Sequence, residues 1–218
     1  MSGGGPDEQA MLASMGRGPD GRSTDIASGA GTPHWLAAML NYCTRCGAEL
    51  QLTVPPDEDR ERLACPDCGH ITYVNPRLVV TTLPVTATGD LVLIRRGIEP
   101  GYGSWAQPGG FLEVDETVGE AAVRETLEET GLLVQPGELI GLYSRLEAAV
   151  VTLVFEAAVV GGAPRTCAET LEVRAFRPDA IPWPEIAFKT SYWGIRDWVH
   201  RRHPGVELPS TFRGREAL

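Results

Sequence analysis

The central part of the chain carries apolar, β-branched stretches separated by turn residues, which is the pattern of a β-sheet. Residues 78–85 and 91–94 are two such stretches, and the sequence Thr88-Gly89-Asp90 between them predicts a hairpin. Further strands are predicted near residues 138–146, 148–160 and 171–177, with turns near Glu147 and at Gly161-Gly162-Ala163-Pro164. We expect these strands to form one sheet.

Two segments have the pattern of helices. Thr117 and Glu120 have the spacing of a capping box, and Gly131 stands where a glycine that ends a helix is expected. Residues 188–202 predict a second helix, whose apolar face contains Tyr192, Ile195 and either Val199 or Trp198. A mixed sheet with one helix in mid-chain and another near the end predicts an α/β sandwich.

The two ends of the chain are predicted to lie outside the folded domains. Residues 1–33 are rich in glycine and hold few large apolar groups, so they cannot bury enough surface to offset the entropy of ordering. We expect a disordered tail there, and a second tail at residues 205–218. The apolar segment 33–40 predicts a short helix that packs on the next module, or alternatively docks on a partner.

Four of the five cysteines occur as two C-x2-C pairs, Cys43 with Cys46 and Cys65 with Cys68. A glycine follows the second cysteine of each pair, which suits a tight turn. The spacing predicts a zinc ribbon over residues 34–75, in which the four thiolates hold a structural Zn²⁺. A redox C-x-x-C pair is the alternative, but it needs a βαβ context that this part of the sequence lacks.

The net charge of the chain indicates which classes of binding partner it favours. The chain has 218 residues and a formal net charge of −10, which argues against non-specific binding of nucleic acid. A phosphate substrate is still allowed, because metal ions can supply positive charge locally. No run of 18 apolar residues predicts a membrane span, and the first residues lack the apolar region of a signal peptide. We expect a cytoplasmic protein without nucleic-acid or membrane partners.

The predicted mid-chain helix carries three glutamates on one face. At about 100° per residue, Glu125, Glu128 and Glu129 fall within an arc of about 100°. A solvated charge run normally alternates signs, but Arg124 is the only cation near this face. Carboxylates are ligands for Mg²⁺, which takes one or two of them together with phosphate oxygens. The crowding therefore indicates a divalent-cation site.

The spacing from Gly110 to Leu132 is G-x5-E-x7-R-E-U-x-E-E-x-G-U, where U is a bulky aliphatic residue. It resembles the Nudix box of the Nudix hydrolases, with one departure at Thr126, a position that packs rather than reacts. The resemblance implies a Nudix-type α/β/α sandwich with a mixed sheet over residues 76–204. It also implies hydrolysis of a diphosphate bond in a nucleoside diphosphate derivative, with catalytic Mg²⁺ or Mn²⁺.

The resemblance further implies roles for single residues. Glu125 and Glu129 match the main metal ligands, and Glu128 adds a third carboxylate. The backbone carbonyl of Gly109 would be a further ligand, and Gly109 and Gly110 are expected to contact the substrate.

Three more residues have expected roles beside these ligands. Arg124 would orient the glutamates, and Glu116 would support the loop before the helix by pairing with a cation. In several Nudix enzymes the general base comes from a loop after the box, where Glu169 is our candidate. The nearby Cys167 is expected to be a buried or inert thiol.

A zinc ribbon ahead of a Nudix domain resembles two subgroups, the NADH pyrophosphatases and a group of ADP-ribose/FAD pyrophosphatases. The first group carries S-Q-P-W-P-F-P-x-S soon after the box. Residues 181–188 lack the Ser-Gln and diverge after the second proline, so we interpret them as a rigid connection to the last helix. Segments that resemble the second group are Tyr42-Cys43, Cys68-Gly69-His70-Ile71, Asn75-Pro76-Arg77, Glu169-x-Leu171-Glu172 and Ala187-Phe188.

The sequence therefore favours cleavage of ADP-ribose or FAD to AMP and a second phosphate ester. NADH pyrophosphatase activity is the nearest alternative. A different class is also open, a ligand-sensing regulatory or nucleic-acid-binding protein with a zinc ribbon and a Nudix-derived domain. Such proteins tend to lose glutamates of the box, and all are present here. A homodimer formed through the ribbon is a further alternative.

Overall fold

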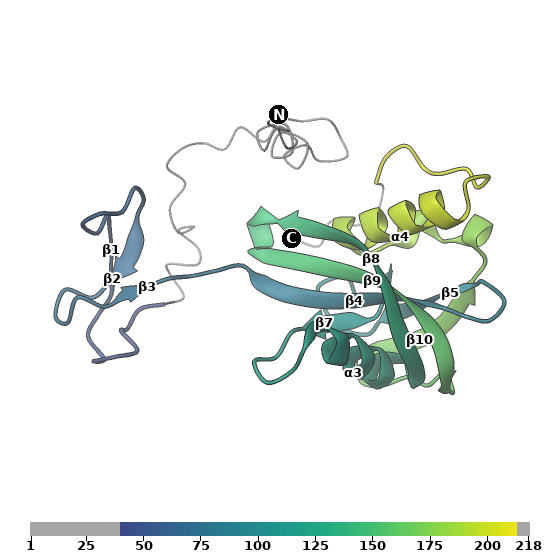
Figure 1. Ribbon diagram of the computed structural model, residues 1–218, viewed down its shortest axis with the longest axis horizontal. Helices are drawn as coiled ribbons and strands as arrows, with labels where there is room; N and C mark the ends of the chain where they lie inside the picture. Colours follow the sequence, from purple (N-terminus) through teal and green to yellow (C-terminus); the bar gives the residue numbers. More distant parts are fainter. Residues whose placement is uncertain (1–39, 213–218) are drawn as a thin grey trace, which may run out of the picture. The chain divides into compact units, whose positions relative to one another are not determined.

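The computed structural model describes residues 40–212, so the expectations for the tail at residues 1–33 and for a helix beginning at residue 33 lie outside the described part. The chain divides into two compact units, Met1–Val74 and Asn75–Leu218 (Figure 1). Within residues 40–212, no helix is long and apolar enough to span a membrane.

The first unit contains a small antiparallel sheet in the order β1-β2-β3. Its strands are β1 (Gln51–Thr53), β2 (Arg62–Ala64) and β3 (Ile71–Thr72). Leu63 in the central strand is 3% exposed, and the other buried apolar residues among residues 40–74 are Cys43, Pro55 and Cys65. So few apolar residues make a weak core, which is the situation in which small domains depend on disulfides or metals.

The second unit is built on a mixed sheet in the order β10-β5-β4-β9-β8, with β6 paired to β5 and β7 paired to β4. Its strands are β4 (Arg77–Val85), β5 (Leu91–Arg96), β6 (Trp105–Ala106), β7 (Gly109–Phe111), β8 (Leu132–Arg145), β9 (Val150–Gly162) and β10 (Thr170–Phe176). The β4–β9 pair is parallel and the remaining pairs are antiparallel.

Two helices cover opposite faces of this sheet (Figure 1). On α3 (Val118–Thr130), Ala121 and Ala122 pack against Val80 of β4. On α4 (Lys189–Arg202), the apolar face joins the larger core, which also contains Ile140 and Val154 of the sheet. The buried residues of this face are Tyr192, Ile195, Trp198 and Val199. The predicted fold class, an α/β/α sandwich with a mixed sheet and a preceding zinc ribbon, is confirmed.

Two predicted elements differ in extent. The strand expected near 138–146 begins at Leu132, directly after α3, because Leu132 and Val134 are buried while Leu133 between them is exposed. The Pro136-Gly137 sequence does not break the strand, since register shifts accommodate it. The predicted hairpin pairs only at Val85 and Leu91, and β4 then pairs with β7 and β9 instead.

The segments around α4 are ordered by packing. The predicted rigid connection at residues 181–188 contains a short 3-10 helix, η3 (Trp183–Glu185), and a second, η2 (Pro178–Ala180), precedes it. A third, η1 (Leu146–Ala148), joins β8 to β9. After α4, Val206, Leu208 and Phe212 pack against the core, and the Tyr192 hydroxyl donates to the carbonyl of Pro209 at 2.7 Å. The expectation of a tail from residue 205 onward did not anticipate this packing.

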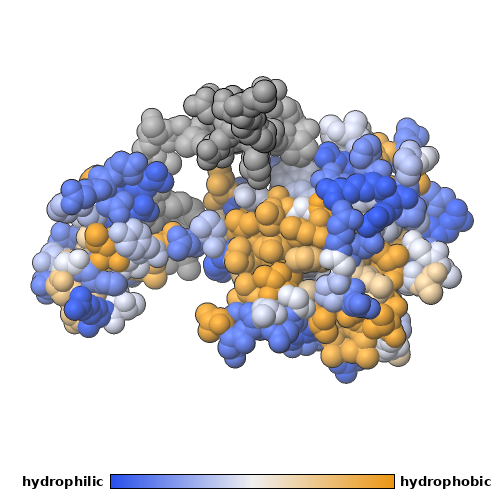
Figure 2. Space-filling model, in the orientation of Figure 1, coloured by the Kyte–Doolittle hydropathy of each residue, from blue (hydrophilic) through white to orange (hydrophobic). Residues whose placement is uncertain are grey.

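Apolar side chains also gather on the surface of the second unit. Figure 2 shows them over the region where β8 and β9 lie. The exposed large apolar residues of these two strands are Leu133, Leu139, Leu142 and Val160. Contiguous exposed apolar surface is more typical of association surfaces than of solvated ones.

Candidate active site

The mid-chain helix α3 positions the glutamates, and its ends are fixed as the sequence predicts. The Thr117 side chain accepts a hydrogen bond from the backbone of Glu120, and the Glu120 carboxylate accepts one from the Thr117 amide. At the other end Gly131 has a left-handed φ of 75°, and its N–H bonds the carbonyl of Leu127. Since one face of α3 packs on the sheet, the glutamates are presented beside β7.

Arg124 is the centre of a cluster of ion pairs. Its guanidinium donates to Glu116 at 2.6 and 2.9 Å and to Glu125 at 2.8 Å, and it lies 3.6 Å from Glu128. It also donates to the carbonyl of Phe111 at 3.2 Å. The hydrogen bonds from Arg124, aided by the amide of Glu113, lower the pKa of Glu116 to about 2. These contacts place Arg124 and Glu116 where the sequence expects them, between the loop and the carboxylates.

Glu129 is the most buried of the three helix carboxylates. It is 8% exposed, and its Oε2 accepts a hydrogen bond from the amide of Gly109 at 2.8 Å. Burial, together with the nearby carboxylates of Glu125 and Glu169, raises the pKa of Glu129 to about 7, against the lowering effects of the Gly109 amide and of Arg96. Glu129 is therefore a buried anion whose charge is only partly compensated by the protein.

Glu125 packs directly against the glycine pair. A Cβ atom on Gly110 would lie 2.6 Å from Cδ of Glu125, so only glycine leaves room for this carboxylate. Burial raises the pKa of Glu125 although Arg124 donates to it. Glu128 differs from both, because its side chain is 60% exposed.

These residues line one cavity of about 680 Å³, a size typical of ligand sites. Its wall includes the predicted residues Gly109, Gly110, Glu125, Glu128, Glu129 and Glu169, together with Val79, Arg96, Ile98, Phe111, Glu113, Cys167, Ala168 and Phe188. Arg96 and Phe111 were not predicted, because Arg96 lies in no recognisable motif and Phe111 occupies a position of the box that any residue can fill. Arg96 lies at the end of β5, followed by a Gly/Pro loop, and only its contacts across the fold bring it to the cavity.

The loop before β10 brings Glu169 to the cavity. The carbonyl of Glu169 accepts a hydrogen bond from the amide of Gly97 at 2.7 Å, which ties this loop to the end of β5. The Glu169 side chain is exposed and makes no hydrogen bond or ion pair with any other residue of the described range. Cys167 was expected to be buried or inert, and the first expectation is wrong: it is exposed and lines the cavity, because it lies in this surface loop.

The donor set of the cavity suits a hard divalent cation. Glu125 and Glu129 offer carboxylate oxygens, their pKa values are raised, and no lysine of residues 40–212 lines the cavity. In the structure their side chains turn toward Arg124 and Gly109 respectively. Glu125, Glu129 and the exposed Glu128 are thus the residues that could hold a cation, whose charge would offset the repulsion between them.

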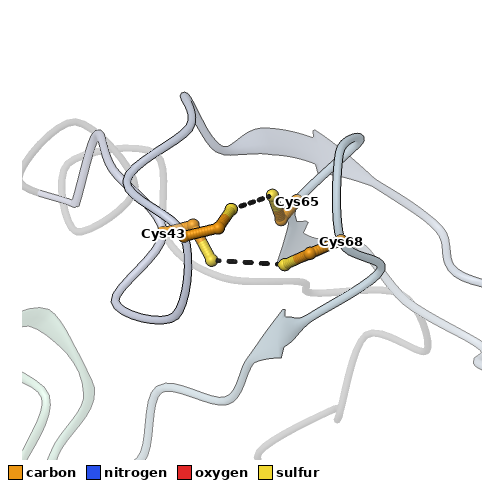
Figure 3. Close-up of side chains that lie close together, drawn as sticks. Cys43, Cys65 and Cys68 are labelled. Atoms are coloured by element: carbon orange, nitrogen blue, oxygen red, sulfur yellow. Dashed lines mark hydrogen bonds between the residues drawn. The ribbon is translucent and has the colours of Figure 1, made fainter.

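The first unit holds a separate cluster of cysteines (Figure 3). The sulfurs of Cys43, Cys46, Cys65 and Cys68 all lie within 4.8 Å of one another, the only such group of three or more His, Cys, Asp or Glu side chains in residues 40–212. Two sulfur–sulfur distances are 3.7 Å (Cys43 to Cys68) and 3.4 Å (Cys46 to Cys65). Tetrahedral zinc with bonds of about 2.3 Å places its sulfurs roughly 3.8 Å apart.

The two cysteine turns are built alike. Gly47 and Gly69 have φ values of 79° and 70°, which favour glycine. The amide of Gly47 donates to the carbonyl of Cys43, and the amide of Gly69 donates to the carbonyl of Cys65. The four thiols therefore fit a closed zinc site of the ribbon type.

Comparison with known proteins agrees with this geometry. The model of the NUDIX domain family matches residues 75–199, and the model of the Nudix N-terminal family matches residues 41–74. A crystal structure of a NUDIX hydrolase from Nitrosomonas europaea superposes with a TM-score of 0.71 at 34% identity and covers 77% of this chain and 95% of that one.

Curated relatives match over shorter lengths. An ADP-ribose pyrophosphatase from Methanocaldococcus jannaschii is 36% identical over 53% of this chain and 69% of its own length. A MutT-like protein from Streptomyces ambofaciens is 39% identical over 47% of this chain and 64% of its own length. The NAD-capped RNA hydrolase NudC of Pseudomonas aeruginosa is 36% identical over 46% of this chain and 34% of its own length. The capped helix, the glycine pair beside its glutamates and the matched models together show that this chain belongs to the Nudix hydrolase family.

Proposed function

We propose that this protein hydrolyses the diphosphate bond of a nucleoside diphosphate derivative, ADP-ribose or FAD, to give AMP and a second phosphate ester. The observation that carries the proposal is the pair of carboxylates formed by the half-buried Glu125 and the buried Glu129, held against Gly110 and Gly109 respectively in one cavity. The relative named ADP-ribose pyrophosphatase supports this choice of substrate.

In the proposed reaction, water adds to one phosphorus, the bridging P–O bond breaks, and the leaving oxygen takes a proton. Mg²⁺ or Mn²⁺ held by Glu125, Glu129 and Glu128, with the Gly109 carbonyl as a further ligand, would neutralise phosphate charge and lower the pKa of a bound water. Arg124 orients Glu125 through its ion pair, and Glu116 in turn fixes Arg124. Gly109 and Gly110 let the substrate approach the backbone closely.

Glu169 is the proposed general base. Its carboxylate lines the cavity and lies near enough to Glu129 to raise the pKa of that residue. Because no described side chain pairs with it, Glu169 is free to accept a proton from the attacking water. The four cysteines would hold a structural Zn²⁺, which with four thiolate ligands leaves no open position for chemistry.

The test is a substrate panel with Mg²⁺ or Mn²⁺, in which released mononucleotide is separated by chromatography. The panel contains ADP-ribose, FAD, NADH and an NAD-capped RNA, and Glu129→Gln serves as the inactive control. We expect AMP from ADP-ribose or FAD with the highest kcat/KM. Faster cleavage of NADH would instead favour the NADH pyrophosphatase alternative. Faster cleavage of the capped RNA would favour the substrate in the name of the NudC relatives. Tight binding without any release would favour the ligand-sensing alternative.

We also propose a homodimer. Two surfaces are available for it, the ribbon and the apolar surface over β8 and β9. Light scattering with and without a zinc chelator separates them, because only a dimer formed through the ribbon dissociates when zinc is removed. A monomer under both conditions would contradict the proposal.

A further inference from the structure

The cavity is strongly unbalanced in charge. Of the lining residues within the described part of the chain, five are glutamates, namely Glu113, Glu125, Glu128, Glu129 and Glu169, and Arg96 is the only lysine or arginine. Arg96 enters the cavity from the end of β5, whereas three of the glutamates come from α3. An anionic substrate therefore meets one fixed cation of the protein in this cavity.

The guanidinium of Arg96 is held in place but its outer donors are unused. Its Nε donates to the carbonyl of Pro100 at 2.9 Å, and its Cζ lies 5.0 Å from the ring centroid of Phe188. Within residues 40–212, Nη1 and Nη2 make no hydrogen bond or ion pair. Burial lowers the pKa of Arg96, against the attraction of Glu129 and Glu169. A partly buried charge without an ion-pair partner among the described residues costs free energy, so its presence calls for an explanation.

The loop after β5 is folded around the Arg96 stem. Gly101 has a φ of 86°, and a Cβ there would lie 3.5 Å from both Cδ and Nε of Arg96. The amide of Arg96 donates to the carbonyl of Ser104 at 2.9 Å, and its carbonyl accepts from the amide of Gly103 at 2.8 Å. The side chain is thus preorganised, which reduces the conformational entropy lost when it binds a ligand.

We propose that Arg96 binds the diphosphate of the substrate, with Nη1 and Nη2 donating to non-bridging oxygens of one phosphoryl group. This inference rests on the proposed function. A guanidinium offers two parallel N–H groups that match phosphate oxygens, and such charge-assisted bonds are about twice as strong as neutral ones. The α3 carboxylates repel the same oxygens unless a cation lies between them, so Arg96 supplies the attraction that comes from the protein itself.

Phe188 acts through Arg96 as a positioning residue. Cζ of Arg96 lies over its ring just before α4 begins, and this contact, together with the hydrogen bond to the Pro100 carbonyl, restricts the guanidinium. A Phe188→Leu variant keeps the apolar contact with the Arg96 stem but loses the ring face. We expect it to weaken phosphate binding less than loss of Arg96 does, and to add no further loss when Arg96 is already replaced by Met.

The test measures binding of imidodiphosphate, a diphosphate with a non-hydrolysable bridge, by calorimetry in the presence of Mg²⁺. The variants are Arg96→Met and Arg96→Lys, and Arg95→Met is the matched control. Arg95 is the neighbouring residue of β5 and donates to the same loop, from Nε to the carbonyl of Gly103 at 2.9 Å, but it does not line the cavity. We expect Arg96→Met to weaken binding roughly 10- to 100-fold, Arg96→Lys to weaken it less, and Arg95→Met to leave it unchanged.

Circular dichroism and the thermal midpoint show whether each variant is folded. If Arg96→Met does not fold, the test rests on Arg96→Lys. This variant keeps the positive charge but loses the two parallel N–H groups of the guanidinium. Equal affinity of wild type, Arg96→Lys and Arg96→Met for imidodiphosphate would overturn the inference. Failure of the proposed function has a different readout. The wild-type protein would then release no mononucleotide from any substrate of the panel, whether or not imidodiphosphate binding depends on Arg96.

Discussion

Thr126 of α3 and Thr82 of β4 share a hydrogen bond between hydroxyl oxygens that lie 2.6 Å apart. Both side chains are 0% exposed. The Thr126 hydroxyl donates to the carbonyl of Ala122 at 2.7 Å, so the hydrogen between the two threonines comes from Thr82. This pair accounts for the departure from the Nudix box at Thr126, because a buried hydroxyl is tolerated where it has partners.

The direction of these bonds predicts unequal effects of two similar substitutions. Thr126→Val leaves the buried Thr82 hydroxyl without its acceptor and should lower the free energy of unfolding by about 1–3 kcal/mol. Thr82→Val should cost less, because Thr126 keeps its bond to Ala122. The double variant should be close to wild type, since no hydroxyl is then left unpaired. Urea denaturation of all four proteins gives the comparison, and additive losses in the double variant would refute this account.

Glu129→Gln should lower turnover by roughly 10²–10³-fold while the fold survives. The amide oxygen of the introduced glutamine can still accept from Gly109, and the substitution removes a buried negative charge whose pKa is raised. Steady-state rates at saturating Mg²⁺ and the thermal midpoint measure the two effects.

The control for this prediction is Glu128→Gln. Its side chain is 60% exposed, so we expect a smaller loss of rate. A Glu129→Gln enzyme with a rate close to wild type would remove Glu129 from the proposed metal ligands.

The two neighbouring glycines of the box should respond differently to alanine. In Gly110→Ala the new Cβ displaces the Glu125 carboxylate, so turnover should fall and the Mg²⁺ concentration for half-maximal rate should rise, with the fold retained. In Gly109→Ala the Cβ lies 2.6 Å from Cα of Thr81 and φ is 148°, so we expect a loss of roughly 2 kcal/mol or more in unfolding free energy. Denaturation and Mg²⁺ titrations distinguish them. The prediction fails if Gly110→Ala unfolds at a lower denaturant concentration than Gly109→Ala.

Removal of zinc should unfold the first unit and spare the second. Structural zinc in small domains contributes on the order of 10 kcal/mol, and the ribbon has little apolar core of its own. After chelation, hydrogen exchange should become fast in residues 40–74 and stay slow in the strands and helices of residues 75–212. Cys43→Ser should show the same pattern without chelator, whereas Cys167→Ser should keep zinc. Slow exchange in a ribbon shown to be free of metal would contradict the zinc site.

Short sequence motifs were sufficient to predict the ends of α3 and the cysteine cluster. The capping box at Thr117, the glycine at Gly131 and the cysteine spacing depend on residues close in sequence, and the structure has these features where they were predicted. The helix from residue 188 was placed within one residue of α4.

The rest depends on contacts that the sequence pattern does not encode. Pro136 and Gly137 are ordinary breakers, but pairing with β9 keeps them inside β8. Arg96 carries no motif and reaches the cavity only because β5 ends beside the loop of Glu169. Thr82 and Thr126 are 44 residues apart, so their bond is visible only in the folded chain.

The parallel pairing of β4 with β9 has a consequence for how the protein folds. Arg77 pairs with Val150 and Val85 with Ala158, so the two central strands meet only after the loop that contains β7 and α3 has closed. The chain loses conformational entropy when so long a loop closes, and the stabilising contacts between the strands form only afterwards. Such pairing is therefore slow. During synthesis, a nascent chain that ends before residue 150 already contains every residue of the Nudix box, but lacks the strand on which their arrangement depends.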